Sequence, residues 1–452
     1  MPRTLFQGAW RVLAPLGIAA LLLSLSVPAL ASTFNVVYNF AANPDGSAPV
    51  PQGALLQDAL GNLYGELSSG GTFDLGANYG VSSNGVTFGI LYNFGTASTD
   101  GAGPVAGLRN ILFDANVTGL DYGVTESGGA NGVGTVFLQN ASGPFSTIYA
   151  FQGGTDGANP AGRLLPWFNG DYYGTTIAGG GLAEAGTIFR ISGSGHYSVL
   201  HRFSGPDGEN PWGGLQYGSD GNFYGTTLGG GADGNGAVYR VTPGGHVTVI
   251  YSFTGGNDGA NPFGELATDF HGNLYGTTSS GGANGNGTIF RVNQWGHLTT
   301  LYSFPNDING NPVNGAFPNS TLTLGIECSH SDFVRRASFG TLLSSHASVR
   351  PDNMSAGVTL YGVTPSGGAD SSGVAFSFNV ATSTYTILWN FTGGTDGADP
   401  NGKLLTSFDG NIYGVTAGGG SSGNGDVFAI GGVLQPGTLP LTQPARPVKH
   451  IH

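Results

Sequence analysis

Aspartates that recur in one repeated loop are the first candidates for chemistry in this sequence. They stand in segments of the form Asp-Gly-X-Asn/Asp-Pro, at Asp156, Asp207, Asp258 and Asp396. Carboxylates beside glycine-rich backbone could bind Ca²⁺, which prefers oxygen ligands. The alternative is that Asp-Gly forms a tight turn that the proline ends before the next strand. Recurrence favours the turn, because a scaffold repeats what folding requires. Ligand or calcium binding at these residues is the second hypothesis.

Charged residues at a position that varies between repeats are the second group of candidates. The residue after the glycine that opens the first strand of each repeat is Ala54, Leu108, Arg163, Gly214, Glu265, Ala316 and Lys403 in turn. Folding does not dictate a side chain that changes from repeat to repeat. We therefore interpret Arg163, Glu265 and Lys403 as ligand-binding candidates, with ordinary solvated charge as the alternative.

No catalytic motif accompanies these residues. The sequence lacks G-x-S-x-G, H-E-x-x-H and a P-loop. Tyrosines that precede a glycine in each repeat could stack on sugar rings, but we expect them to fill the core between repeats. Arg190, Arg240 and Arg291 share one position in their repeats, and we expect them to pair with acids.

Two markers show that the chain consists of seven repeats. Tyr-Gly recurs with tyrosine at positions 64, 122, 173, 224, 275, 361 and 413. A phenylalanine that closes a strand recurs at positions 40, 94, 151, 203, 253, 304 and 391. One repeat predicts strand A (265–269), strand B (274–278), strand C (288–292) and strand D (297–304), with period-2 alternation rich in β-branched and aromatic residues. Repeated units of four short strands predict an all-β, seven-bladed β-propeller.

The two ends of the repeat region are complementary. Residues 33–40, TFNVVYNF, form a strand D with no strands A to C before it. Residues 425–430, GDVFAI, form a strand C with no strand D after it. We predict that these segments pair and close the ring, because closure removes exposed sheet edges.

The remaining segments suggest an exported protein. Residues 1–31 have two arginines, an apolar stretch at 12–27 and the small-residue pattern Ala29-x-Ala31, which predict a signal peptide. The propeller is expected over 32–434, with an insertion at 324–357 in the sixth repeat, and a flexible tail over 435–452. Cleavage would take the formal net charge from −13 to −15, which argues against nucleic acid and anionic membranes as partners. No later segment is apolar enough to span a membrane, and we expect a secreted or periplasmic monomer.

The repeat resembles a known family. The pattern DGANP…GNLYGTT…GGGADGNGAVYRV is similar to the GloVer-type tandem repeat of exported bacterial proteins, over most of residues 33–434. The resemblance implies a repeat architecture and export, and it supplies no reaction.

These observations favour a non-enzymatic scaffold or binding module. The ligand class we expect is carbohydrate or cell-envelope polymer, bound on the face that carries the D–A and B–C loops. No cofactor is expected unless the aspartate loops hold calcium. The alternative is a propeller enzyme, a polysaccharide hydrolase or lyase, which would need unique acids, His or Tyr converging in the channel. A purely structural surface protein is the third hypothesis.

Overall fold

Each repeat folds into an antiparallel sheet whose four strands pair in chain order. In the fifth repeat, β20 (Ala260–Thr268), β21 (Asn273–Ser280), β22 (Thr288–Asn293) and β23 (Leu298–Ser303) are strands A to D. The glycine after each strand-B tyrosine permits close packing within the sheet. A Cβ at Gly276 would lie 2.5 Å from the Cζ atom of Phe290 on strand C. The absence of a side chain at Gly276 therefore leaves room for the Phe290 ring against strand B.

The computed structural model describes residues 32–41, 53–58, 60–110, 120–140, 145–167, 170–269, 271–327, 357–407, 409–433 and 438–440. The signal peptide expected at 1–31, residues 328–356 of the expected insertion, and most of the expected tail lie outside the described residues.

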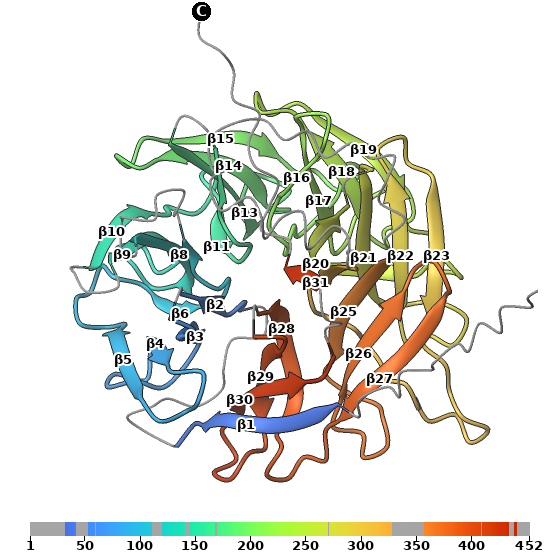
Figure 1. Cartoon of the computed structure of the whole chain (residues 1–452). Coiled ribbons are helices and arrows are strands. Elements are labelled where there is room, and N and C mark those ends of the chain that lie inside the picture. The colour runs from blue at the N-terminus through green and yellow to red at the C-terminus, as the bar shows by residue number, and fades with distance from the viewer. Residues whose placement is uncertain are drawn as a thin grey trace, which may run out of the picture. The chain divides into compact units, whose positions relative to one another are not determined.

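Seven such sheets, the blades, are arranged in a ring around a common axis within Ser32–His452 (Figure 1). The described residues contain strands and no helix. We number the blades in chain order of their strand A. Blades one and two comprise β2 (Leu56–Gln57), β3 (Leu63–Leu67), β4 (Ala77–Val81) and β5 (Phe88–Asn93), then β6 (Ala102–Pro104), β7 (Arg109–Asn110), β8 (Leu120–Ser127), β9 (Thr135–Asn140) and β10 (Phe145–Ala150). Blades three and four comprise β11 (Ala158–Pro160), β12 (Leu165–Pro166), β13 (Asp171–Ala178), β14 (Thr187–Ser192) and β15 (Tyr197–Arg202), then β16 (Gln216–Tyr217), β17 (Phe223–Thr227), β18 (Ala237–Val241) and β19 (Val247–Ser252).

Blades six and seven follow the fifth. They comprise β24 (Thr323–Glu327), β25 (Val358–Thr364), β26 (Val374–Asn379) and β27 (Thr384–Asn390), then β28 (Ala398–Thr406), β29 (Ile412–Gly418), β30 (Asp426–Gly431) and β1 (Thr33–Asn39). Within the expected tail, β31 (Thr438–Pro440) pairs antiparallel with β24 as a fifth strand of blade six.

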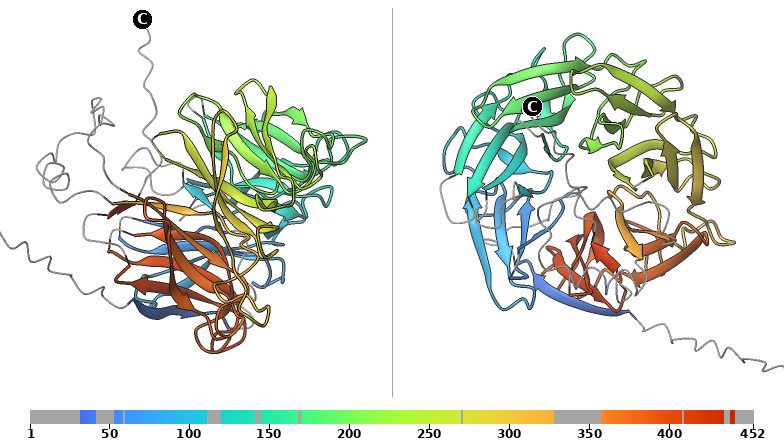
Figure 2. Two further views of the ribbon diagram at one scale, coloured as in Figure 1. Left: turned by 90° about the vertical axis from the view of Figure 1, so that its right-hand side faces the viewer. Right: turned by 45° about the horizontal axis from the view of Figure 1, so that its top comes forward.

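The ring closes as predicted from the sequence. β1, at the start of the repeat region, pairs antiparallel with β30, so that Phe34 faces Ile430 and Asn39 faces Asp426. Figures 1 and 2 show the blue strand β1 lying along the red strands of blade seven. The seven-bladed β-propeller is therefore confirmed.

The core lies between neighbouring blades. Tyr224 of blade four belongs to a buried cluster with Leu266 and Phe290 of blade five, and its side chain is only 1% exposed. Its hydroxyl donates a 2.8 Å hydrogen bond to Asp220 in the turn between strands A and B. The equivalent Tyr275 is also 1% exposed and donates a 2.9 Å bond to Asp269. The expected role of these tyrosines in core packing is confirmed, since burial leaves no face for a sugar ring.

No helix among the described residues is long and apolar enough to cross a membrane.

Candidate binding site

The aspartates of the D–A loops accept hydrogen bonds from residues of the same loop and of the strand D before it. Asp258 accepts hydrogen bonds from the backbone N–H of Thr254 (2.8 Å), the hydroxyl of Thr254 (2.6 Å) and the hydroxyl of Tyr251 (2.9 Å). Partial burial acts to raise the pKa of Asp258, but these hydrogen bonds outweigh it, so the pKa lies below its ordinary value. The carboxylate is thus an ionised acceptor that fixes the loop to the end of strand D.

The same arrangement recurs around the ring. Asp156 accepts bonds from Tyr149 and Gln152, Asp207 from His201 and Ser204, and Asp396 from Trp389 and Thr392. Each aspartate belongs to a different blade. Among the described residues, no group of three or more Asp, Glu, His or Cys side chains is arranged to hold a metal ion. This geometry fits the turn interpretation, and calcium binding at these loops stays a prediction.

Replacing one of these aspartates separates the two interpretations. We expect Asp258→Ala to lower the free energy of unfolding by about 1–2 kcal/mol, because Tyr251 and Thr254 lose their acceptor. Chelation of the wild-type chain with EDTA should leave its melting temperature unchanged. Thermal unfolding of both proteins, with and without EDTA, measures this. A fall in the wild-type melting temperature on chelation, absent in the variant, would establish the calcium interpretation instead.

The three charged candidates meet at the channel. Arg163, Glu265 and Lys403 come from blades three, five and seven and line one small void of about 10 Å³, together with Ala106, Ala161, Gly214 and Thr321. They are distant in the chain and adjacent in the fold because strand A of each blade is the strand nearest the channel.

Two members of the predicted ring were wrong. In blade two Arg109 pairs with Tyr122 as Leu165 pairs with Tyr173 in blade three, so Gly107 corresponds to Arg163, and Leu108 lies one residue further along in the core.

Ala316 bridges Ser366, as Ala260 in blade five pairs with Ser280, so Ala316 lies before the ring position. Thr321 takes the place instead and lines the void. The sixth repeat has Ser320 where blade five has Gly264, and in blade two the glycine occupies the ring position itself, so the glycine does not mark the position in these two blades.

A break in strand A directs these side chains. In blade five the pairing register shifts between Phe263 and Ala267, and Glu265 lies inside this bulge. Gly264 there adopts φ +83°, a conformation that L side chains rarely adopt. Bulges commonly redirect a side chain next to a functional site. A register shift between Asn401 and Leu405 places Lys403 in the same way.

A larger cavity of about 750 Å³ opens beside this ring. Arg163 and Lys403 line it, and the rest of its wall comes mainly from blades one and seven: Ala54, Leu55, Leu56, Gln57, Asp58, Leu60, Gly61, Ser83, Thr323, Leu404, Leu405, Thr406, Ser407 and Asp409. Its lining includes the A–B turns at Asp58 and Asp409 and the C–D turn at Ser83. These turns lie on the face opposite the D–A loops, so the larger space is on the face opposite the one expected from the sequence.

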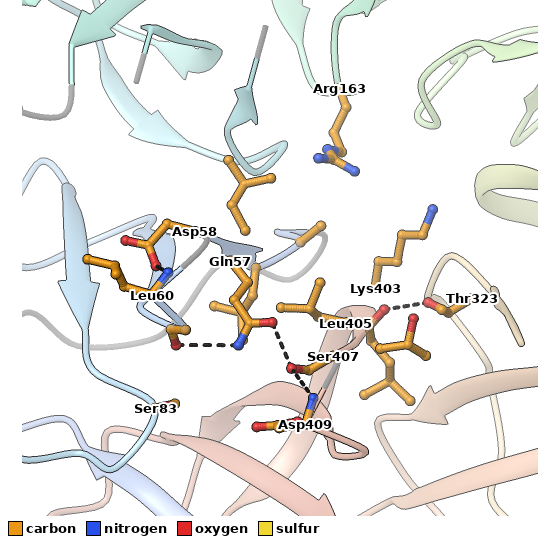
Figure 3. A pocket seen from close by; sticks show the side chains of 16 residues that line it. Gln57, Asp58, Leu60, Ser83, Arg163, Thr323, Lys403, Leu405, Ser407 and Asp409 are labelled. Carbon is orange, nitrogen blue, oxygen red and sulfur yellow. Dashed lines mark hydrogen bonds between the residues drawn. The ribbon is translucent and has the colours of Figure 1, made fainter. Parts of the chain in front are cut away.

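Hydrogen bonds across the ring closure hold the cavity wall (Figure 3). The Ser407 hydroxyl of blade seven donates a 2.7 Å bond to the side-chain oxygen of Gln57 in blade one. Gln57 in turn donates to the carbonyl of Gly61 at 3.3 Å. The Thr323 hydroxyl of blade six donates to the carbonyl of Leu404. Three blades are therefore joined around one cavity, which gives it a fixed wall.

The acids of the large cavity serve its turns. Asp58 accepts bonds from the backbone and side chain of Asn62, both at 2.8 Å, and from the Tyr64 hydroxyl at 2.9 Å. Asp409 accepts a 2.6 Å bond from Tyr413. Burial acts to raise the pKa of each acid, and the hydrogen bonds outweigh it, so both pKa values lie below the ordinary value. Neither carboxyl is suited to act as a proton donor at neutral pH.

Of the strand-C arginines, Arg190 pairs with Asp171 at 3.7 Å, as expected from the sequence. The polar residues Gln57, Thr321 and Ser407 were missed. Only Thr321 could have been found from the sequence. The segment GAFP of the sixth repeat corresponds to GANP of the fifth, and Thr321 follows Ala316 at the spacing at which Glu265 follows Ala260.

Comparison with known proteins identifies the repeat. The family model described as the Gloeobacter/Verrucomicrobia repeat matches residues 25–197 and 169–327, about two thirds of the chain. The chain belongs to this family. The two matches of the Gloeobacter/Verrucomicrobia repeat together span blades one to five. No curated protein matches the chain.

Solved structures similar to this member of the Gloeobacter/Verrucomicrobia repeat family include three with low identity. A chain of a nidogen/laminin complex is 16% identical, covers 63% of this chain and 82% of its own, with a TM-score of 0.37. A Bacteroides thetaiotaomicron protein of unknown function is 11% identical, with coverages of 89% and 76% and a TM-score of 0.45. A Thermus thermophilus protein, named as a candidate oxidoreductase (glucose dehydrogenase), is 13% identical, with coverages of 88% and 99% and a TM-score of 0.42.

Proposed function

We propose that this chain is an exported, non-enzymatic binding module that takes a carbohydrate or cell-envelope polymer into its channel. The observation that carries the proposal is the cavity of about 750 Å³ on the A–B face, which lies in the range typical of ligand sites. Export rests on the charged and apolar pattern of residues 1–31.

The wall of the cavity has the mixed character that a saccharide requires. Leu55, Leu56 and Leu405 supply apolar surface, which suits the C–H faces of a sugar ring. Gln57 and Ser407 are donors and acceptors held by each other, which suits its hydroxyl groups. The void that Arg163, Glu265 and Lys403 line at the ring measures only about 10 Å³. A ligand would therefore enter from the A–B face.

The same geometry favours binding over hydrolysis. Hydrolysis of a glycosidic bond ordinarily uses two carboxyl groups, one of them with a raised pKa. Asp58 and Asp409 have lowered pKa values and cap their own turns. Glu265 is the acid at the ring, and its side chain is only 6% exposed.

Narrowing the cavity mouth tests this proposal. Ser83 lies in the C–D turn of blade one, at the cavity wall, and we expect Ser83→Trp to weaken polysaccharide binding at least tenfold by occupying the entrance. The measurement is a glycan array with residues 32–452, followed by titration of each bound glycan. Ser194→Trp is the matched control, because it adds the same indole to the C–D turn of blade three, and blade five carries Trp295 in its own C–D turn.

Two results would contradict the proposal. One is that residues 32–452 bind no glycan or envelope polymer. The other is that Ser83→Trp and Ser194→Trp bind as tightly as the wild type. Release of shortened or unsaturated saccharides during incubation would establish the enzyme alternative.

A further inference from the structure

We infer that the channel recognises an anionic group, a carboxylate, phosphate or sulfate, through Arg163 and Lys403 at the narrow end of the large cavity. The inference rests on the proposed function for the saccharide that carries this group, and it concerns the charge of the ligand. Both side chains line the small void and the large cavity, so they stand where the two spaces meet. Figure 3 shows both side chains extending into the same open region from opposite sides.

The position of these cations is unusual for this chain. It has only 14 Lys and Arg residues against 27 Asp and Glu, and Lys403 is one of two lysines. Two like charges in a partly buried channel repel each other and lose hydration, which disfavours the empty site. An anion placed between them would relieve both costs. Positive charge concentrated in the channel of an acidic protein also attracts anions toward it.

Arg163 is positioned but not neutralised by the protein. One of its terminal nitrogens donates a 3.0 Å hydrogen bond to the carbonyl of Leu108. Its Nε atom is buried and has no hydrogen-bond partner among the described residues. No ion pair joins Arg163 to a carboxylate in the described part of the chain. Because a guanidinium has five N–H donors, the Leu108 contact fixes its orientation and leaves donors for a ligand.

Glu265 sets the net charge of the site. Its carboxylate lies over Gly214, where a Cβ would come within 2.7 Å of its Oε1 atom, and it faces the same void as the two cations. Among the described residues that line this void, it is the one acid beside two bases. A singly charged group such as a uronate carboxylate would bring the acids and bases of this lining to equal numbers.

The acids on the cavity wall do not cancel this charge pattern. Asp58 and Asp409 accept hydrogen bonds from Tyr64 and Tyr413 and from the backbone of their own turns. Both acids stand in the A–B turns, and Figure 3 shows them apart from Arg163 and Lys403. The ligand would therefore place one anionic group at Arg163 and Lys403, and its neighbouring sugar rings against Leu405 and Gln57.

Calorimetric titration of residues 32–452 tests the inference with three probes: oligogalacturonate, its methyl ester, and inorganic phosphate. The methyl ester keeps the sugar and removes the charge. We expect oligogalacturonate to bind at least tenfold more tightly than the ester. Arg163→Gln and Lys403→Gln should each weaken oligogalacturonate tenfold or more and leave the ester unchanged. Glu265→Gln should strengthen oligogalacturonate severalfold, because it removes the repelling charge.

Arg240→Gln is the control, since Arg240 lies on β18, strand C of blade four, and does not line either cavity. Melting temperatures of all variants verify folding, and Arg163→Lys should restore part of the affinity by returning the charge. Equal binding of oligogalacturonate and its ester, unaffected by Arg163→Gln or Lys403→Gln, would overturn the inference while leaving the proposed saccharide function intact. Phosphate binding that both variants abolish, without binding of any saccharide, would support the anion site and refute the saccharide function. Absence of binding by all three probes would overturn the inference.

Discussion

Replacing Asp426 with threonine is expected to raise the free energy of unfolding by about 3 kcal/mol at pH 8 and by much less at pH 4. Asp426 begins β30 and its side chain is 0% exposed. Neither of its carboxyl oxygens has a hydrogen-bond partner among the described residues. A buried carboxylate without partners is costly, because the folded protein does not replace the water that it loses.

Threonine is the substitution that the other blades suggest. At the equivalent place in blades two, three and five, two threonine hydroxyls form a hydrogen bond: Thr125 with Thr135 at 2.8 Å, Thr176 with Thr187 at 2.8 Å, and Thr278 with Thr288 at 2.9 Å. Blade seven keeps the first member as Thr416, whose hydroxyl accepts a 2.9 Å bond from the backbone N–H of Asp426. Asp426→Thr should restore the pair without changing the backbone.

The pH dependence follows from the direction of the pKa shift. Burial, with a further contribution from the nearby Asp396 charge, raises the pKa of Asp426 from 3.8 to about 7, although its contact with Thr416 acts to lower it. Because the folded pKa lies above the unfolded pKa, the unfolded state loses its proton first as the pH rises. The resulting penalty is absent below about pH 4, grows between pH 4 and 7, and is complete above pH 7.

Urea unfolding of the wild type and Asp426→Thr at pH 4 and pH 8 measures the effect. The reciprocal variant Thr288→Asp is the control, since it places the same buried acid in blade five and should lose stability mainly at pH 8. A stability gain of equal size at both pH values would attribute the effect to packing and refute the titration argument.

The architecture could be predicted because the same pattern of strands and turns recurs in successive repeats. Strand D alternates with period 2, and the phenylalanine that closes it is buried each time, as with Phe40, Phe94 and Phe253. Residues 33–40 form a strand D without strands A to C, and residues 425–430 form a strand C without a strand D. The two segments pair as β1 and β30. Local pattern and topology agree in every such case, which is why the fold follows from the sequence.

The site could be predicted only in part. Arg163, Glu265 and Lys403 line one void because they occupy the same position on strand A of their blades, and equivalent positions lie at the same height along the ring axis. The large cavity could not be foreseen, since its volume depends on how β2 and β28 pack beside the channel, and side-chain packing across blades leaves no periodic signal. Asp426 was missed because a single acid in place of a threonine does not interrupt the strand pattern.

Phe40→Ala is expected to lower the free energy of unfolding by about 3–5 kcal/mol, the usual cost of truncating a fully buried phenylalanine. Phe40 follows β1, is 0% exposed, and packs edge-on against Tyr79 of blade one with ring centroids 5.2 Å apart. Its cluster also contains Val427 of blade seven. One side chain therefore joins the first blade to the last.

The position of Phe40 gives this loss a second consequence. Its backbone N–H bonds to the carbonyl of Gly425 at 3.1 Å, directly before β30. Without the ring that anchors it, β1 should separate from β30 more often, so amide hydrogen exchange should accelerate along Asp426–Gly431. Asn35→Ala is the matched control, because Asn35 is exposed on the same strand and should change stability by less than about 0.5 kcal/mol. If Phe40→Ala instead lowered stability with no faster exchange in β30, pairing of the two chain ends would not be what keeps this ring closed.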